Sequence, residues 1–304
     1  MGLDLKNLEM LLYCKQKNIK FGKVLTLGRQ ENLIDKNFLQ SKNPKLYNSL
    51  ANINEKYADK IIIELGAKKV YSIDKSTYEK ASLTHDLNAM PPKKIHNKFD
   101  LVLDFGTLEH TFHYTMALKH AMMCIKRGGH FLCSTPANNC CGHGFWQTSP
   151  ELFFAVFCEK NGFKLKQLFI TETNPFSSWY SYNLKTLPNS LTTRWKCPAN
   201  SVSPFYVMAL AQRVSIKKIF NTVPQQQCYI QMWKKRKIKF FQKQERNSIF
   251  RKIKTICINI KIYKTLFQAK QKVLDLKSII FFWLAKPSKN QIYLREIGQE
   301  LKTK

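Results

Sequence analysis

FDLVLDFGTLEHTFH, residues 99–113, begins as a short apolar run bounded by acids and continues into a glycine and a group of polar residues. A run of this length between turn-forming residues is typical of a strand that is buried on both faces. Phe99 to Leu103 are therefore expected to lie in the core, and residues from Asp104 onward are expected at the rim of a sheet. The segment predicts a strand that delivers polar side chains to one edge of that sheet.

Other apolar runs of strand length occur along the first two thirds of the chain. They lie at residues 23–28, 68–74, 128–136, 163–172 and 204–214. Helix-length segments such as 116–126 separate the earlier runs. Alternation of buried strands with helices predicts an α/β fold with a doubly wound, mostly parallel sheet.

The last part of the chain has a different composition. Residues 216–304 contain 22 Lys and Arg residues but only 4 Asp and Glu residues. The whole chain of 304 residues has a net charge of +30. Ile249, Ile253, Ile256, Ile260, Tyr263 and Phe267 follow helical spacing. We therefore expect one domain over 1–215 and a basic, amphipathic, mainly helical extension over 216–304, although ICINIKIY also fits a strand.

The positive charge indicates an anionic neighbour, such as a membrane surface or nucleic acid. One prediction for residues 216–304 is docking on an anionic membrane through the basic amphipathic helix. A helical subdomain packed on the sheet and a poorly ordered basic tail are the alternatives. The charge alone says nothing about the fold.

Cysteine usage and the lack of a leader predict a cytoplasmic protein, with the inner face of the membrane as a peripheral site. The nine cysteines include no CxxC pair, so a disulfide framework is not expected. Cys133, Cys140, Cys141 and His143 match no standard zinc spacing, so no metal is expected. No signal peptide is visible, and no apolar run approaches the roughly 20 residues that a spanning helix needs.

Turn-forming and acidic residues follow the predicted strands at one edge of the sheet. Gly28 lets the backbone turn next to a ligand, and Asp74 is placed to accept hydrogen bonds from a ribose diol. Each is also an ordinary turn former, so their ordered arrangement is the stronger signal. Neither GxGxxG nor GxxxxGK[ST] occurs, which argues against a dehydrogenase and a phosphate-loop hydrolase. A nucleoside without phosphates remains.

Five segments then resemble a known family. They are VLTLGRQ (24–30), ANINEKYADKIIIELGAKKVYSIDKSTYEKASLTHDLN (51–88), FDLVLDFGTLEH (99–110), KRGGHFLCSTPANN (126–139) and GHGFWQTSPELF (142–153). Over residues 1–215 the chain resembles class I S-adenosylmethionine-dependent methyltransferases, and more narrowly bacterial methyltransferases associated with cell-surface polysaccharide genes. The resemblance implies a Rossmann-like sheet of seven strands and S-adenosylmethionine as cofactor.

The resemblance also implies residue roles. It places Gly28 against the methionine moiety of the cofactor and gives Asp74 the ribose hydroxyls. Asp86 and Leu87 would frame the adenine. Asp104, Phe105 and Gly106 would lie beside the methyl group. The first loop departs from the family pattern, because a single glycine is followed there by Arg29-Gln30.

Methyl transfer to a hydroxyl requires removal of a proton, and a histidine is the natural base at neutral pH. His143, in a glycine-flanked loop, is the first candidate, and His110 is the second. Both have structural alternatives, as a loop-shaping residue and as a locally bonded residue at a helix start. Glu109 is interpreted as an orienting or capping carboxylate, and Trp146 as a sugar-stacking or core aromatic residue.

Three functions remain open at this point. The first is O-methylation of a sugar, glycan or other small acceptor by a methyltransferase. The second is methylation of nucleic acid with help from the basic tail. The third is a non-catalytic protein that binds the cofactor or a partner.

Overall fold

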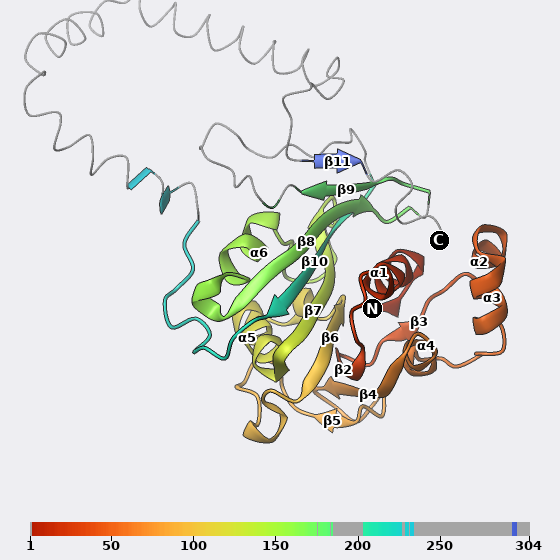
Figure 1. The fold of residues 1–304 in the computed structure, drawn as a ribbon, viewed down its shortest axis with the longest axis horizontal. Helices are drawn as coiled ribbons and strands as arrows, with labels where there is room; N and C mark the ends of the chain where they lie inside the picture. The colour runs from red at the N-terminus through yellow and green to blue at the C-terminus, as the bar shows by residue number, and fades with distance from the viewer. Residues whose placement is uncertain are drawn as a thin grey trace, which may run out of the picture. The chain divides into compact units, whose positions relative to one another are not determined.

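The computed structural model describes residues 2–174, 176–182, 184, 203–226, 229–230, 232–233 and 294–296 (Figure 1). The chain divides into two compact units, and the first contains residues 1–185, 201–224 and 294–304. The second, residues 186–200 and 225–293, lies almost entirely outside the described residues. The division into residues 1–215 and 216–304 therefore stays a prediction. The amphipathic helix expected over 249–267 lies outside the described residues.

A nine-stranded sheet forms the centre of the first unit. Its strands are β2 (Gly22–Leu27), β4 (Ala67–Asp74), β5 (Leu83–Thr84), β6 (Phe99–Phe105), β7 (Ile125–Asn138), β8 (Phe163–Glu172), β9 (Trp179–Tyr182), β10 (Phe205–Arg213) and β11 (Leu294–Glu296), in the order β11-β9-β8-β10-β7-β6-β2-β4-β5. The strands β5, β4, β2, β6 and β7 are parallel, and β10 runs antiparallel between β7 and β8. The six strands predicted from apolar runs are all present.

Within the described residues the sheet has nine strands, so the expected number of seven is not confirmed. Short strands β9 and β11 extend it beyond β8 by antiparallel pairing. β11 comes from the segment that the sequence assigns to a helical extension, so these three residues are strand and belong to the sheet edge.

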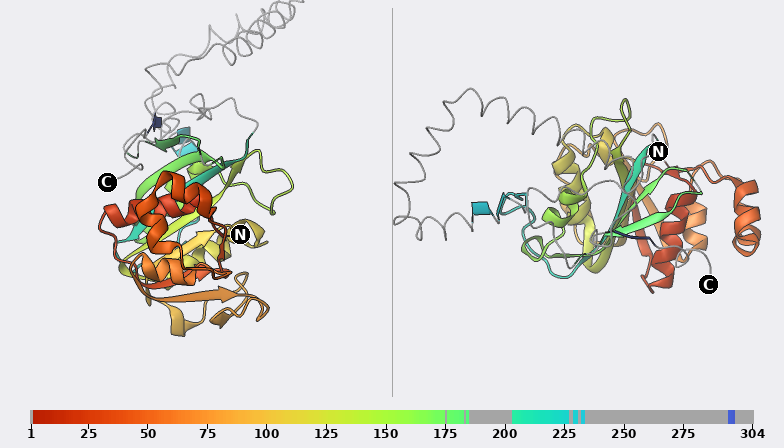
Figure 2. Two further views of the ribbon diagram at one scale, coloured as in Figure 1. Left: turned by 90° about the vertical axis from the view of Figure 1, so that its right-hand side faces the viewer. Right: turned by 90° about the horizontal axis from the view of Figure 1, so that it is seen from above.

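Helices cover both faces of the sheet, as Figures 1 and 2 show. On one face lie α1 (Leu5–Gln16) and α4 (Asp59–Glu64), and on the other lie α5 (Tyr114–Cys124) and α6 (Pro150–Val156). The smaller elements are α2 (Lys36–Lys42), α3 (Pro44–Leu50), β1 (Gly2–Leu3), β3 (Glu31–Asn32) and the 3₁₀ turns η1 (Lys93–Ile95), η2 (Leu108–His110) and η3 (Glu159–Asn161). The predicted doubly wound α/β fold is confirmed.

The strand order reverses at β2, which pairs with β4 on one side and with β6 on the other. The register places Leu27 opposite Ile73, and Thr26 opposite Leu103. The carboxyl ends of three parallel strands therefore meet at one edge of the sheet. In doubly wound sheets ligands bind at this reversal point.

The end of β6 is buried further than the sequence predicts. Residues 101–109 are all buried, and His110 is the first exposed residue. The residues expected at the rim from Asp104 onward are buried as far as Glu109, and the Asp104 carboxylate accepts hydrogen bonds from the backbone of Thr107 and Leu108. These bonds fold the chain into a turn that stays under the surface.

Among the helices that the structure describes, none is both long enough and apolar enough to cross a bilayer. The cytoplasmic location and the docking of residues 216–304 on a membrane stay predictions.

A buried histidine on α5 makes the stability of the fold sensitive to acid. His120 is fully buried, and burial, with a smaller effect of the neighbouring His85, lowers its pKa to about 4. Below the ordinary histidine pKa of about 6.5 the unfolded chain binds a proton that the folded chain does not, so stability falls as the pH falls. At pH 5 we expect a loss of about 2 kcal/mol relative to pH 7.

Urea unfolding of the wild type and of His120→Leu at both pH values measures this loss. The variant should lose less stability than the wild type by about that amount. Equal losses in the two proteins would show that another group carries the acid sensitivity.

Candidate functional site

The tip of β2 is tightly packed against the turn that follows β6. Gly28 has a positive φ of 67°, and its backbone N–H donates to Ile73 O at 2.8 Å. A Cβ atom at this position would lie 2.7 Å from Thr107 Oγ1, which itself donates to Leu27 O at 2.6 Å. The glycine is thus needed for close approach of the Thr107 side chain. The predicted contact of Gly28 with a cofactor stays a prediction.

Arg29 and Gln30, which stand in place of the usual glycines, are fixed by hydrogen bonds to neighbouring residues. Arg29 donates to Asp59 Oδ2 at 3.1 Å and to Glu79 O at 2.8 Å, and stacks on Tyr57 at 4.0 Å. Gln30 is buried and donates to Leu27 O at 2.5 Å. Its Oε1 atom is buried with no hydrogen-bond partner in the described part of the chain. This loop therefore offers one unsatisfied acceptor next to the tip of β2.

Asp74 ends β4 and is half-buried. Its Oδ1 atom accepts a long hydrogen bond, 3.3 Å, from Ser76 N. No ion pair involves this carboxylate within the described residues. The Asp74 carboxylate can therefore accept hydrogen bonds from a ligand at the reversal point beside β2.

Asp86 and Leu87 lie in the loop after β5. The Asp86 carboxylate accepts two hydrogen bonds from Asn88, at 2.9 and 2.7 Å, and pairs with Lys75 at 3.4 Å. The bonds from Asn88, assisted by Lys75, hold the pKa of Asp86 below its ordinary value. Leu87 is buried. Asp86 is thus largely occupied by its own loop, and the places of Asp86 and Leu87 beside an adenine stay predictions.

Asp104, Phe105 and Gly106 end β6. Asp104 is fully buried, and its Oδ1 accepts hydrogen bonds from Thr107 N at 2.9 Å and Leu108 N at 3.3 Å. Its Oδ2 has no partner among the described residues, and burial raises its pKa. Phe105 is buried, and Gly106 has a φ of 99°. Asp104 therefore shapes the turn, and its predicted contact with a ligand remains a prediction.

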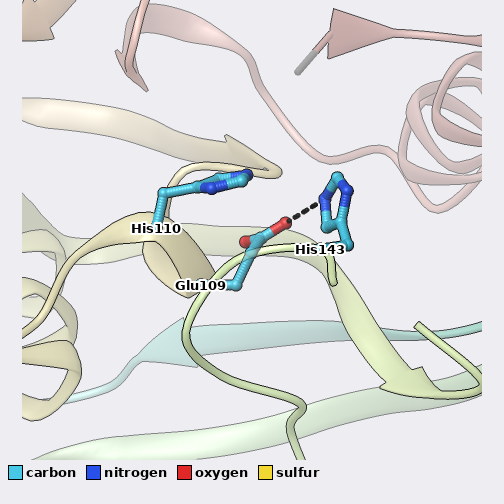
Figure 3. A group of neighbouring side chains, drawn as sticks. All are labelled: Glu109, His110 and His143. Carbon is cyan, nitrogen blue, oxygen red and sulfur yellow. Dashed lines mark ion pairs between the residues drawn. The ribbon is translucent and has the colours of Figure 1, made fainter. Parts of the chain in front are cut away.

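Glu109, His110 and His143 come together beyond the tip of β6 (Figure 3). Turn η2 carries Glu109 and His110, and the loop after β7 carries His143. Glu109 Oε1 lies 3.6 Å from His143 Nε2, and the two histidine rings are 5.0 Å apart between centroids. We call these three residues the Glu-His-His cluster. The two histidines that the sequence predicts as alternative bases are thus neighbours.

The loop that carries His143 is fixed to the backbone of Glu109. The N–H groups of Phe145 and Trp146 both donate to Glu109 O, at 2.8 and 3.3 Å. Gly144 has a φ of 72°, and a Cβ atom there would lie 2.9 Å from the same oxygen. A glycine at 144 is therefore required for this close approach, and it brings His143 beside the carboxylate.

Burial sets the protonation of the cluster. Burial raises the pKa of Glu109, and the nearby Asp104 raises it further. Burial and the neighbouring His143 lower the pKa of His110, so this ring is held in its neutral form. A neutral imidazole beside a buried acid can accept a proton or bind a cation.

Exposed aromatic rings flank the Glu-His-His cluster. Phe112 and Phe145 are 63% and 68% exposed, and their rings meet edge to face at 5.9 Å. Trp146 is 44% exposed and donates from Nε1 to Thr111 O at 3.1 Å. Large exposed rings beside polar groups suit the apolar face of a sugar or another ring.

Three parts of this arrangement were not predicted from the sequence. Gln30 appears in the sequence analysis only as part of the departure from the family pattern, without a role, and Thr107 was not considered. The contact between Glu109 and His143 joins positions 34 residues apart, and only the glycines around His143 hinted at a close backbone approach.

The sequence matches none of the protein-family models and none of the curated proteins with which it was compared. Similar solved structures include a protein from Bacillus halodurans C-125 provisionally described as a methyltransferase, with a TM-score of 0.39 and 13% identity over 67% of this chain and 99% of that one. The N-methyltransferase NodS from Bradyrhizobium japonicum WM9, in complex with S-adenosyl-L-homocysteine, has a TM-score of 0.37 and 11% identity over 70% and 89%.

The branched-chain polyamine synthase from Thermus thermophilus, in complex with 5'-methylthioadenosine, has a TM-score of 0.33 and 14% identity, over 71% of this chain and 59% of that one. At these scores the similarities identify neither a reaction nor a substrate for this chain. Its function has to be inferred from its own residues.

Proposed function

We propose that the chain transfers a methyl group from S-adenosylmethionine to a hydroxyl group of a small acceptor, with a sugar or glycan as the preferred class. The observation that carries the proposal is the reversal of the strand order at β2. There the tips of three parallel strands bring Gly28, Asp74 and Gly106 to one edge, and the Glu-His-His cluster follows the tip of β6. A nucleoside and a proton acceptor can therefore share that edge.

The residues at this edge fit a cofactor with a ribose and a charged amino group. The half-buried Asp74 carboxylate can accept hydrogen bonds from a ribose diol. The buried Oε1 of Gln30, which has no partner within the described residues, is an acceptor suited to an ammonium group. The cofactor would be surrounded by Gly28, Leu87 and residues 104–106, and Asp86 would lie near its adenine ring.

When bound, the cofactor supplies a methyl group on a positively charged sulfur. The chain must align the acceptor oxygen with that methyl group and remove the hydroxyl proton. His143 would accept the proton at Nδ1, while Glu109 orients the ring from the other side, with its Oε1 3.6 Å from Nε2. His110 is the alternative acceptor. The exposed rings of Phe112 and Phe145 would hold the acceptor by stacking.

The charge of +30 supports one competing function, the methylation of nucleic acid. That function predicts tight RNA or DNA binding that weakens steeply with salt. A non-catalytic protein of this fold would instead bind the cofactor without transferring the methyl group to any acceptor. Transfer of labelled methyl groups to glycan, nucleic-acid and protein fractions separates these three.

Asp74→Ala is expected to weaken S-adenosylmethionine binding at least tenfold, which is about 1.4 kcal/mol. The reason is the loss of the carboxylate that would hold the ribose hydroxyls. Calorimetric titration of the full chain measures the change. Glu64→Ala is the control. Glu64 is exposed at the end of α4, close in sequence to the amino end of β4, whereas Asp74 lies at the carboxyl end, so this variant should leave the affinity unchanged.

Two results would contradict the proposal at different levels. Equal affinities of the wild type and Asp74→Ala would reject the role of Asp74 alone. Failure of the wild type to bind S-adenosylmethionine would reject the proposed function.

A further inference from the structure

We propose that Glu109, His110 and His143 bind a divalent transition-metal ion, with Zn²⁺ as the type. The site stands on these three side chains whether or not the chain transfers methyl groups. Its use in activating an acceptor hydroxyl rests on the proposed function. The sequence predicts no metal, since the set Cys133, Cys140, Cys141 and His143 matches no standard zinc spacing, and only the fold brings the three ligands of the Glu-His-His cluster together.

The three donor groups are close enough to share one ion. One ligand atom of each residue lies within 4.8 Å of the others, and Glu109 Oε1 is 3.6 Å from His143 Nε2. Two ligands at about 2.0–2.1 Å from a tetrahedral ion are about 3.4 Å apart. The carboxylate and His143 already have nearly that separation, and a rotation of the exposed His110 ring supplies the remainder.

Glu109 is a carboxylate that the protein alone does not satisfy. Its side chain is fully buried, and neither oxygen has a hydrogen bond within the described residues. Buried polar groups nearly always have a hydrogen-bond partner, and the nearest group recorded for this carboxyl is His143 at 3.6 Å. A cation between Glu109 and the two histidines would bind the unpartnered oxygens, which makes the carboxyl group an independent indication of a ligand.

The backbone around the cluster is arranged before any ion binds. The Glu109 carbonyl holds the 142–146 loop through two hydrogen bonds, and Gly144 packs against it. His110 and His143 are exposed, so their rings can turn while the backbone stays in place. Fixed backbones with mobile rings favour metal binding, because little of the chain has to be ordered.

The donor set selects the class of metal. Two imidazoles and one carboxylate suit Zn²⁺, Fe²⁺, Co²⁺ and similar ions, whereas Mg²⁺ and Ca²⁺ prefer oxygen ligands. Three protein ligands leave at least one position open, which is the arrangement of catalytic rather than structural zinc sites. The open position is where an acceptor hydroxyl would bind.

An ion in this position would take over the role that His143 has as a base in the metal-free site. It would lower the pKa of the acceptor hydroxyl. The O–H bond then breaks and its proton passes to water. The new O–C bond forms as the S–CH₃ bond of the sulfonium breaks, and a neutral thioether leaves.

The test is a titration of the chelator-treated full chain with Co²⁺, followed by its visible absorption, and then with Zn²⁺ in competition. We expect one equivalent to bind. Glu109→Gln, His110→Asn and His143→Asn should each weaken binding at least about tenfold. His113→Asn removes an exposed histidine three residues from His110, and Cys141→Ser removes an exposed thiol near His143; both should bind as the wild type does.

Absence of stoichiometric binding to the wild type would overturn the inference, and so would binding lost in Cys141→Ser but kept in the cluster variants. His143→Asn changes an exposed side chain, so the test does not depend on the folding of Glu109→Gln. S-adenosylmethionine affinity measured on the same proteins separates the two proposals. Metal binding without cofactor binding would leave the site standing and reject the proposed function, and the reverse result would do the opposite.

Discussion

Arg213→Ala is expected to lower the free energy of unfolding by about 3 kcal/mol, because each buried oxygen that loses its partner costs about 1–3 kcal/mol. Arg213 ends β10 and is almost fully buried. Its Nη1 atom lies 3.1 Å from Met122 O, 2.7 Å from Ile125 O and 2.7 Å from Asn97 Oδ1. The guanidinium thus binds the carbonyl oxygen of Met122 in the last turn of α5 and that of Ile125, the first residue of β7. Alanine removes these hydrogen bonds from buried oxygens.

Urea unfolding of the two proteins measures this loss. Lys164→Ala serves as a control, because Lys164 is exposed on β8 opposite Gln212, the neighbour of Arg213. This control should change stability by less than about 0.5 kcal/mol. Arg213→Lys should lie in between, since an ammonium group cannot reach as many oxygens as the guanidinium fork. A loss below 1 kcal/mol for Arg213→Ala would show that water replaces the guanidinium.

Glu109→Met is expected to raise the free energy of unfolding of the chelator-treated chain by about 1–4 kcal/mol. A buried carboxylate without hydrogen bonds is replaced by an apolar side chain of similar size. Burial raises the pKa of Glu109, so the folded chain keeps a proton that the unfolded chain releases above its ordinary pKa. The cost of the carboxyl group therefore grows as the pH rises, and the gain from methionine should be larger at pH 8 than at pH 5.

Glu109→Gln is the matched control. It removes the ionisation but keeps a polar group, so it should abolish the pH dependence and gain less stability. Saturating Zn²⁺ should reverse the order by stabilising the wild type but not Glu109→Met. A lower stability of Glu109→Met without metal would show that the carboxylate has a partner that stabilises the fold.

The apolar runs predicted most of the sheet, because its central strands are buried on both faces and contain little else. Val24 to Leu27 and Leu101 to Leu103 are all buried. The short strands β9 and β11 were not predicted, because they lack such a run. The four residues of β9 and the three of β11 are too short to show a period, and their pairing depends on contacts between Tyr182 and Leu294, which are distant in sequence.

The site could be predicted as a set of positions but not as a geometry. The strand order puts Gly28, Asp74 and Asp104 at one edge, which follows from parallel strands alone. That the Asp104 carboxylate turns inward to the backbone of Thr107 could not be deduced, since an acid at a strand tip serves equally well as a ligand or a turn former. The pairing of His143 with Glu109 depends on the loop backbone.

The attachment of the 142–146 loop has a consequence for how proteins of this kind diversify. The loop is tied to the peptide carbonyl of residue 109 and not to its side chain. Exchanges of the side chains at 109, 110 and 143 therefore leave the support in place, whereas an exchange at Gly144 would remove it. Variants of this protein can therefore acquire new reactivity through changes of these three side chains, provided that Gly144 is kept.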